Sequence, residues 1–329
     1  MYNCSINLEQ FSFEPRNYFI FYSSDKLIVY KNNNFLVISD CKDNIKYQIK
    51  LPNNYKIFES IDLDDCVLFM FSGKEILIVN KDTFESTFYA MEYEKFGIGT
   101  TKILPGFSPD EIIFGTQCRG GLQVVSYNFR ERCRSAQSMT MKMTKFTDFL
   151  LENSKIYAVM DSTYILCLEP STCETLWKKF ETSAITPKVL LNNNQVLYTC
   201  QGSIKEISKL DSRTIKIPFI KVSSLENVSD DLIYFTYDDK NNLACYNTKL
   251  STVEWEIKNI GPIKQSFMLN GIFNKNNHEV LLGYNNDNLF LVDLTSKQIV
   301  YKSKMNILSM KESGQHILIY KTNGMTDII

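Results

Sequence analysis

The chain has little histidine and no residue pattern typical of a catalytic or metal site. Only His278 and His316 occur in 329 residues, and neither belongs to a His-x-x-x-His or Cys-x-x-Cys motif. Histidine is the commonest acid–base group near neutral pH, and zinc sites need clustered ligands. A Gly-x-Ser-x-Gly elbow and a phosphate-binding loop are also missing. We therefore interpret both histidines as structural or solvated, and expect no metal and no cofactor.

Paired cysteines, long apolar runs and a secretory leader are absent as well. The nine cysteines are scattered singly, whereas a secreted disulfide framework has an even number at closer spacing. No stretch approaches the roughly eighteen consecutive apolar residues of a membrane span. The first residues lack the basic and apolar regions of a signal peptide. We therefore expect a cytoplasmic protein without a membrane span.

Excess charge of one sign is missing too. The formal net charge is −1, which argues against a protein that coats nucleic acid. Hydrophobic residues make up 44% of the chain and aromatic residues 13%. This is ample for a folded core and excludes a disordered chain.

What the chain does contain is a ten-residue phrase that recurs every 39 to 46 residues. In each copy an apolar strand leads into a polar turn, and a second strand then reaches an aromatic position. The clearest copies are residues 168–177 and 246–255. Weaker copies end on Tyr47, Phe88 and Tyr301, and degenerate ones end on Arg134 and Lys216. A period of this length is typical of propeller blades.

Within each period, short runs rich in β-branched and aromatic residues alternate with turn clusters. This pattern predicts an all-β fold in which residues 1–329 form a single β-propeller domain. We place the complete blades at residues 18–51, 55–92, 99–139, 141–182, 186–220, 223–259 and 264–303.

The two chain ends supply the remaining strands. Residues 306–329 offer three strands, and residues 2–13 offer one. Pairing the N-terminal strand with the C-terminal strands would close an eight-bladed propeller and remove two unpaired sheet edges. A seven-bladed propeller is the alternative if residues 1–16 only cover the surface.

The copy that ends on Trp177 resembles the quinoprotein-type propeller repeat, whose motif is Leu-Asp-Ala-x-Thr-Gly-x-x-x-Trp. Here the phrase reads Leu-Glu-Pro-Ser-Thr-Cys-Glu-Thr-Leu-Trp over residues 168–177, and residues 246–255 and 292–301 match it more loosely. In that family the terminal ring docks against the neighbouring blade. The resemblance implies this structural role for Tyr47, Phe88, Trp177, Trp255 and Tyr301.

The cofactor of that family is not implied. Members that bind the quinone use a vicinal disulfide and a calcium ion, and this chain has no adjacent cysteines. The resemblance therefore implies the scaffold without the cofactor. WD40 repeats are a weaker match, because no Trp-Asp dipeptide follows a repeat.

Arginine is concentrated in one blade. The chain has 30 lysines but six arginines, and residues 119–145 carry a formal charge of +5. The guanidinium group binds carboxylates and phosphates through two parallel hydrogen bonds. The candidate partner-binding residues are Arg119, Arg130, Arg132, Arg134 and Lys142.

Two interpretations of this cluster stay open. Residues 55–94, in the preceding blade, carry a formal −6, so the two blades could satisfy each other instead of binding a partner. Because loops alternate between the two ends of a blade, we expect Arg119 at the end opposite Arg130 and Arg132. Residues 223–259, with a formal −4, are a second candidate contact surface.

Together these observations favour a non-enzymatic scaffold that binds a protein or peptide, as a subunit of a larger assembly. One alternative is a metal-dependent hydrolase or lyase at the central channel, for which the acidic turns Asp62–Asp65 and Asp238–Asp239 could supply oxygen ligands. The other is binding of a nucleic acid or another polyanion through the Arg-rich blade.

Overall fold

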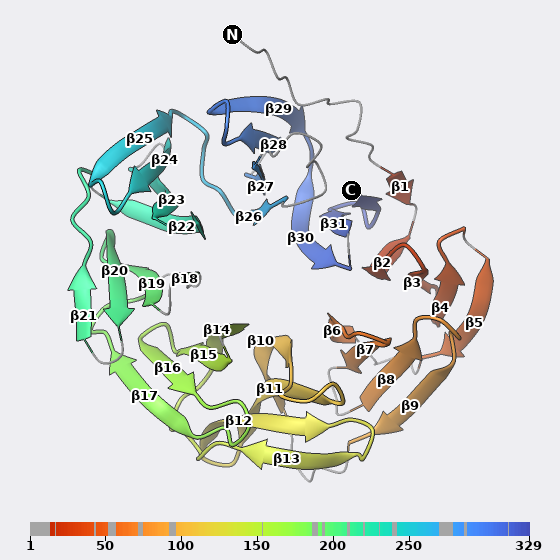
Figure 1. The fold of residues 1–329 in the computed structure, drawn as a ribbon. Coiled ribbons are helices and arrows are strands. Elements are labelled where there is room, and N and C mark those ends of the chain that lie inside the picture. The colour runs from red at the N-terminus through yellow and green to blue at the C-terminus, as the bar shows by residue number, and fades with distance from the viewer. Residues whose placement is uncertain are drawn as a thin grey trace. The chain divides into compact units, whose positions relative to one another are not determined.

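The described chain consists of β-strands arranged in eight four-stranded antiparallel sheets (Figure 1). The fold is an all-β, eight-bladed β-propeller, which confirms the predicted blade number and excludes the seven-bladed alternative. The computed structural model describes residues 14–16, 18–42, 44–51, 57–71, 75–91, 97–152, 154–185, 190–192, 195–208, 211–219, 221–229, 231–238, 242–269, 279–285, 288–314 and 316–329. No α-helix occurs in these ranges, and so none that could cross a membrane.

The chain divides into two compact units, and the first comprises residues 1–48 and 215–329. It contains blades 1, 6 and 7, in which consecutive strands pair with one another, and blade 8. Blade 1 is β2 (Phe19–Ser23), β3 (Leu27–Asn32), β4 (Phe35–Asp40) and β5 (Ile45–Lys50). Blade 6 is β22 (Val222–Ser229), β23 (Leu232–Tyr237), β24 (Asn242–Asn247) and β25 (Thr252–Ile257). Blade 7 is β26 (Gln265–Met268), β27 (Val280–Tyr284), β28 (Asn288–Asp293) and β29 (Gln298–Lys304).

Blade 8 is built from both ends of the chain. It contains β30 (Ile307–Ser313), β31 (His316–Lys321), β32 (Thr326–Ile328) and, at its edge, β1 (Glu14–Arg16). β1 pairs antiparallel with β32, so the expected closure of the last blade by an N-terminal strand is confirmed. Residues 2–13, where we predicted that strand, lie outside the described residues. β1 contains Pro15, which an edge strand tolerates although proline cannot donate a ladder hydrogen bond.

The second unit comprises residues 49–214 and contains blades 2 to 5. Blade 2 is β6 (Ile57–Asp62), β7 (Cys66–Phe71), β8 (Glu75–Asn80) and β9 (Ser86–Ala90). Blade 3 is β10 (Gly97–Pro105), β11 (Glu111–Cys118), β12 (Gly121–Asn128) and β13 (Cys133–Gln137). Blade 4 is β14 (Phe146–Glu152), β15 (Lys155–Met160), β16 (Tyr164–Leu168) and β17 (Thr175–Phe180). Blade 5 is β18 (Leu190–Asn192), β19 (Gln195–Cys200), β20 (Ser203–Ser208) and β21 (Asp211–Thr214).

The hydrophobic core lies between neighbouring blades of each unit. All six residues of β7 are buried, whereas the residues of β9, the last strand of the same blade, are all exposed or half-buried. A strand covered by other blades on both faces needs a continuous apolar run, and a strand with one wet face needs alternation. One such core joins blades 2 and 3, and a second joins blades 3 and 4.

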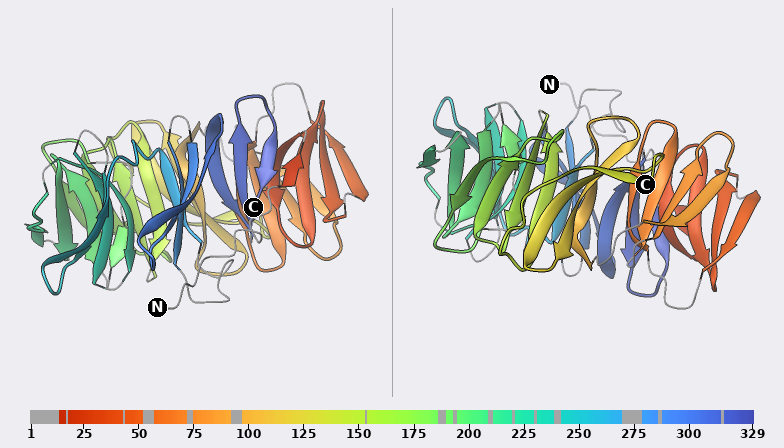
Figure 2. Two further views of the ribbon diagram at one scale, coloured as in Figure 1. Left: turned by 90° about the horizontal axis from the view of Figure 1, so that it is seen from above. Right: turned by 90° about the horizontal axis from the view of Figure 1, so that it is seen from below.

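Within a blade, successive turns lie at opposite ends of the strands, as the side views in Figure 2 show. In blade 3, Arg119 and Gly120 join β11 to β12 at one end, and residues 129–132 join β12 to β13 at the other. The glycine-rich stretch from Gly115 to Gly121 thus contains the turn of a hairpin. Arg119 therefore lies at one end of blade 3, and Arg130 and Arg132 lie at the other.

Candidate interaction surface

The turn before the last strand contains a residue with a positive φ in blades 2, 3, 4, 6 and 7. The positive φ lies between 55° and 61° at Phe84, Cys173, Ser251 and Lys297, each the sixth residue of its copy of the ten-residue phrase, and at Arg132, the eighth residue of the copy that ends on Arg134. The quinoprotein-type motif has glycine at the sixth position, which is the residue that adopts such a φ at no steric cost. In this chain other residues adopt the positive φ at this position.

A β-bulge after this turn places three of the expected docking rings. Trp177 pairs with Cys167, Trp255 with Cys245 and Tyr301 with Leu291, each one residue beyond a register shift. A bulge inserts an extra residue and so moves the following side chains to the other face of the strand. Each ring is half-buried against a core shared with the next blade of its unit.

The rings of blades 1 and 2 lie differently. Tyr47 is 44% exposed and Phe88 is 42% exposed. β9 pairs with β8 without a bulge, so Phe88 faces away from blade 3, and Tyr89 packs against the core between blades 2 and 3. Phe88 instead contacts Phe71 of its own blade, edge to face, with ring centroids 5.5 Å apart. The motif alone did not reveal this shift, because it depends on strand pairing.

Arg130 joins two turns of neighbouring blades. Its Nη2 lies 2.5 Å from Oδ2 of Asp65 in the β6–β7 turn, and its Nε donates a hydrogen bond to Oδ1 of Asp110 in the β10–β11 turn. All three side chains are about half exposed. Burial opposes ionisation of Asp65, but the hydrogen bond and charge of Arg130 outweigh it and lower the pKa of that carboxyl group. Arg130 therefore makes a contact between blades 2 and 3.

The next two arginines also have partners in the protein. The guanidinium carbon of Arg132 lies 4.5 Å from the centre of the Tyr89 ring, a cation–π contact between blades 3 and 2. The hydroxyl of Tyr89 donates a hydrogen bond of 2.5 Å to the carbonyl of Phe129, which strengthens the same junction. Arg134, on β13, donates a hydrogen bond to Gln137 on the same strand.

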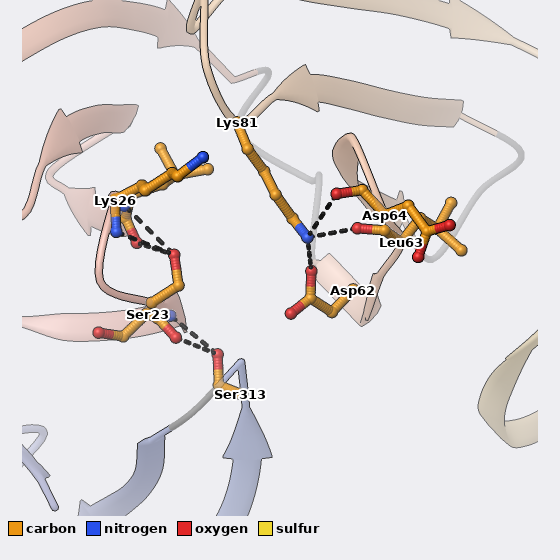
Figure 3. Close-up of polar contacts among 9 residues, drawn as sticks. Ser23, Lys26, Asp62, Leu63, Asp64, Lys81 and Ser313 are labelled. Carbon is orange, nitrogen blue, oxygen red and sulfur yellow. Dashed lines mark hydrogen bonds and ion pairs between the residues drawn. The ribbon is translucent and has the colours of Figure 1, made fainter.

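The acidic turn of blade 2 is held by a lysine. Lys81 contacts the carboxylate of Asp62 at 2.5 Å and donates hydrogen bonds to the carbonyls of Leu63 and Asp64, as Figure 3 shows. In the described part of the chain, no three His, Cys, Asp or Glu side chains are grouped so that they could hold a metal ion. In this turn the carboxylate of Asp62 thus pairs with Lys81, and that of Asp65 pairs with Arg130.

Arg119 and Lys142 lie at the other end of blade 3, and both are exposed. Arg119 is in the β11–β12 turn. Lys142 belongs to the segment from Ser138 to Lys145 that connects β13 to β14, which we call the methionine linker because it contains Met139, Met141 and Met143. Neither cation forms an ion pair with a described residue.

The methionine linker runs against the β11–β12 hairpin. Leu122 and Met141 exchange two backbone hydrogen bonds of 2.8 Å, and the amide of Ser138 donates to the carbonyl of Val124 at 2.8 Å. The approach requires glycine at position 121, where φ is 147° and a Cβ atom would lie 1.8 Å from the carbonyl oxygen of Met141. The linker is therefore tied to blade 3 directly beside Arg119.

Blade 4 holds the other end of the linker. The carboxylate of Asp161 accepts hydrogen bonds from the amides of Thr144 and Lys145, at 3.0 and 2.9 Å, and from the hydroxyl of Thr144 at 2.6 Å. Burial works against ionisation of Asp161, but these donors outweigh it and lower the pKa of the carboxyl group. Between the two anchors, Met139 is 88% exposed, whereas Met141 and Met143 pack against the core between blades 3 and 4.

The described acidic residues of blade 6 make contacts within that blade and with blade 7, and Asp239 lies outside the described residues. In blade 6, buried Glu226 accepts a hydrogen bond from Ser266 of blade 7, and Glu256 accepts one from Tyr237 and pairs with Lys258. The amide of Asn242 donates to Asp238 at 2.8 Å.

His316 lies at the junction of blades 8 and 1. Nδ1 of His316 lies 2.9 Å from the hydroxyl of Ser23, which is buried. Ser313 binds the backbone amide and carbonyl of Ser23 and so joins blades 8 and 1 (Figure 3). His278 lies outside the described residues.

Blades 4 and 5 are joined by a buried carboxylate that the sequence did not single out. Oε2 of Glu181 lies 2.7 Å from Nζ of Lys205, and Oε1 accepts a 2.6 Å hydrogen bond from the hydroxyl of Tyr198. Burial opposes ionisation of Glu181, but the hydrogen bonds from Lys205 and Tyr198 outweigh it and lower the pKa of the carboxyl group.

Comparisons with known proteins agree on the fold. No family model and no curated protein matches the chain. The C-terminal WD40 domain of Sif2 is similar in structure with a TM-score of 0.67 at 10% identity, over 96% of this chain and 97% of that one. Sqt1 of Saccharomyces cerevisiae has a TM-score of 0.65 at 10% identity, over 96% and 97%. BamB of Moraxella catarrhalis has a TM-score of 0.61 at 10% identity, over 96% and 98%. At these identities the likeness shows the propeller fold alone.

Proposed function

We propose that this protein is a non-enzymatic scaffold that binds a protein or peptide partner and serves as a subunit of a larger assembly. The observation that carries the proposal is the methionine linker with Arg119 beside it. The side chains of Met139, Arg119 and Lys142 are exposed there, and neither cation forms an ion pair with a described residue. By contrast, Arg130 and Arg132 contact the neighbouring blade. Methionine and arginine are both enriched in protein–protein interfaces.

We assign the two interpretations of the Arg-rich blade to its two ends. Arg130, Arg132 and Arg134 have partners within the protein, which favours a structural role. Arg119 and Lys142 have none among the described residues, which favours a binding role. We propose Arg119, Met139 and Lys142 as the partner-binding residues.

Charge reversal at the two ends tests the proposal. The variant Arg119→Glu/Lys142→Glu should lose a partner recovered by affinity purification from native lysate, because it places like charges against an acidic partner. The matched variant Arg130→Gln/Arg132→Gln should keep that partner. Equal recovery with both variants and the wild type would remove the binding role from this blade.

Two further expectations belong to the proposal. Burial raises the pKa of the thiols of Cys66, to about 12, and of Cys167, Cys173 and Cys245, to about 11. Such thiols are inert, which supports a protein of the reducing cytoplasm. The positive φ at the sixth position and the bulge before Trp177, Trp255 and Tyr301 support a relationship with the quinoprotein-type repeat.

A further inference from the structure

We infer that the corner formed by Arg119 and the methionine linker binds an acidic peptide segment anchored by one large apolar side chain. This inference deepens the proposed function, on which it rests, by naming the chemistry of the partner. It follows from three properties of the corner: its charge, its exposed methionine and its fixed backbone.

The charge of the corner is uncompensated. Arg119 and Lys142 are exposed and form no ion pair with a described residue. The carboxylate of Asp161, which contacts the linker, already accepts hydrogen bonds from the amides of Thr144 and Lys145 and the hydroxyl of Thr144. Opposite charge on a partner would therefore be attracted to the corner without displacing an existing contact.

Met139 supplies the apolar part of the site. Its side chain is 88% exposed, more than any other large hydrophobic side chain described. The unbranched thioether is flexible and polarisable, so it adapts to apolar groups of different shape. A partner that carries charge alone would leave this side chain in water, so the corner favours a segment with an apolar anchor among its acidic residues.

The backbone that carries these groups is fixed before binding. Hydrogen bonds tie Ser138 and Met141 to β12 and tie Thr144 and Lys145 to Asp161, so both ends of the linker are held. Binding to a fixed backbone needs less ordering of the protein, which increases affinity. Met139 and Lys142 lie between these anchors, where a partner can reach them.

Selection from a displayed random-peptide library against the immobilised full-length protein tests the inference. The enriched peptides should carry net negative charge and at least one large apolar residue. Arg119→Glu/Lys142→Glu should weaken the best peptide more than about tenfold, and Met139→Ser about fivefold, where tenfold corresponds to about 1.4 kcal/mol. The matched control is Phe107→Ser, which removes a 70% exposed side chain from the opposite end of blade 3 and should leave affinity unchanged.

Other outcomes would overturn the inference. Enrichment of neutral or basic peptides, no enrichment at all, or full affinity in the Arg119→Glu/Lys142→Glu variant would each contradict it. Single-stranded DNA that binds as tightly as the best peptide and keeps its affinity for Met139→Ser would identify a polyanion site instead. If the lysate partner of the proposed scaffold is still recovered by the corner variants, the scaffold stands and its docking site lies elsewhere.

Discussion

Replacing Lys205 with methionine should destabilise the protein through a single buried carboxylate. The side chain of Glu181 is 9% exposed and that of Lys205 is 22% exposed, and their charged atoms are 2.7 Å apart. Removing the lysine leaves the Glu181 carboxylate between blades 4 and 5 with the hydroxyl of Tyr198 as its remaining strong donor. Breaking a buried pair in this way costs about 3–5 kcal/mol.

The lower end of that range applies here. Lys205 retains some contact with water, and Tyr198 still stabilises the carboxylate, so we expect a loss of about 3 kcal/mol in the free energy of unfolding. For a cooperative transition of 329 residues, an unfolding entropy of about 2 cal/mol/K per residue converts this loss to a fall of about 4 °C in Tm.

The dependence on pH identifies the cause. In the wild type the pKa of Glu181 is lowered on folding, so the pair stabilises the protein above the unfolded-state pKa of the carboxyl group, and this stabilisation is lost as the pH falls through the folded-state value. Without Lys205, burial should raise the pKa of Glu181 instead. The variant should therefore be penalised most at about pH 7, and the difference from wild type should shrink towards about pH 4.5.

Urea unfolding of the wild type and variants at both pH values measures this difference. The double variant Glu181→Gln/Lys205→Met removes both charges and should recover most of the loss. Lys258→Met is the matched control, because Lys258 pairs with Glu256 in an exposed position, 3.1 Å away, and should cost less than about 1 kcal/mol. A Lys205→Met variant that costs no more than this control, or whose cost is the same at both pH values, would refute the reasoning.

Three further predictions concern the turns and junctions of the blades. Gly121→Ala should lower the unfolding free energy by about 2–3 kcal/mol, because the alanine Cβ would clash with the carbonyl of Met141, and it should weaken binding at the corner. Unchanged urea unfolding would contradict the close approach of the linker. Trp255→Ala should lower the free energy of unfolding by about 3 kcal/mol, because the indole packs against the core between blades 6 and 7. Phe88→Ala should lower it by less than about 1.5 kcal/mol, because Phe88 is 42% exposed. Equal losses of stability in thermal unfolding would show that the bulge does not decide docking. Lys297→Gly should stabilise the protein by about 0.5 kcal/mol, because Lys297 has a φ of 61°. Lys302→Gly, within β29, should destabilise it. A change of the same sign in the unfolding free energy of both variants would refute backbone strain in the turn.

The number of blades could be predicted from the sequence, because apolar runs recur along the chain at a regular spacing. Each blade buries its middle strands on both faces, so the apolar runs recur wherever a blade recurs. The closing strand was harder to place, because Glu14–Arg16 contains proline and charged residues and is stabilised by pairing with β32 rather than by its own pattern. The extent of the single domain predicted for residues 1–329 stays a prediction.

The binding candidates were predicted as a set, and their division required the structure. The sequence placed Arg119 and Arg130 eleven residues apart, but β12 carries them to opposite ends of one blade. The salt bridges of Arg130 connect residues up to 65 positions apart and are invisible in a local pattern. Met139 was missed, although the spacing of Met139, Met141 and Met143 by two residues is a signal that sequence reading could have used.

Site-specific photo-crosslinking tests the central claim, that the corner of blade 3 is where a partner docks. A photoreactive residue at position 139 or, as control, at position 107 would be activated in cells, and the crosslinked peptides would be sequenced by mass spectrometry. We expect one partner segment at position 139, acidic and with a large apolar residue at the crosslink, and none at position 107. A position 139 that yields no crosslink, or the same products as position 107, would contradict the account.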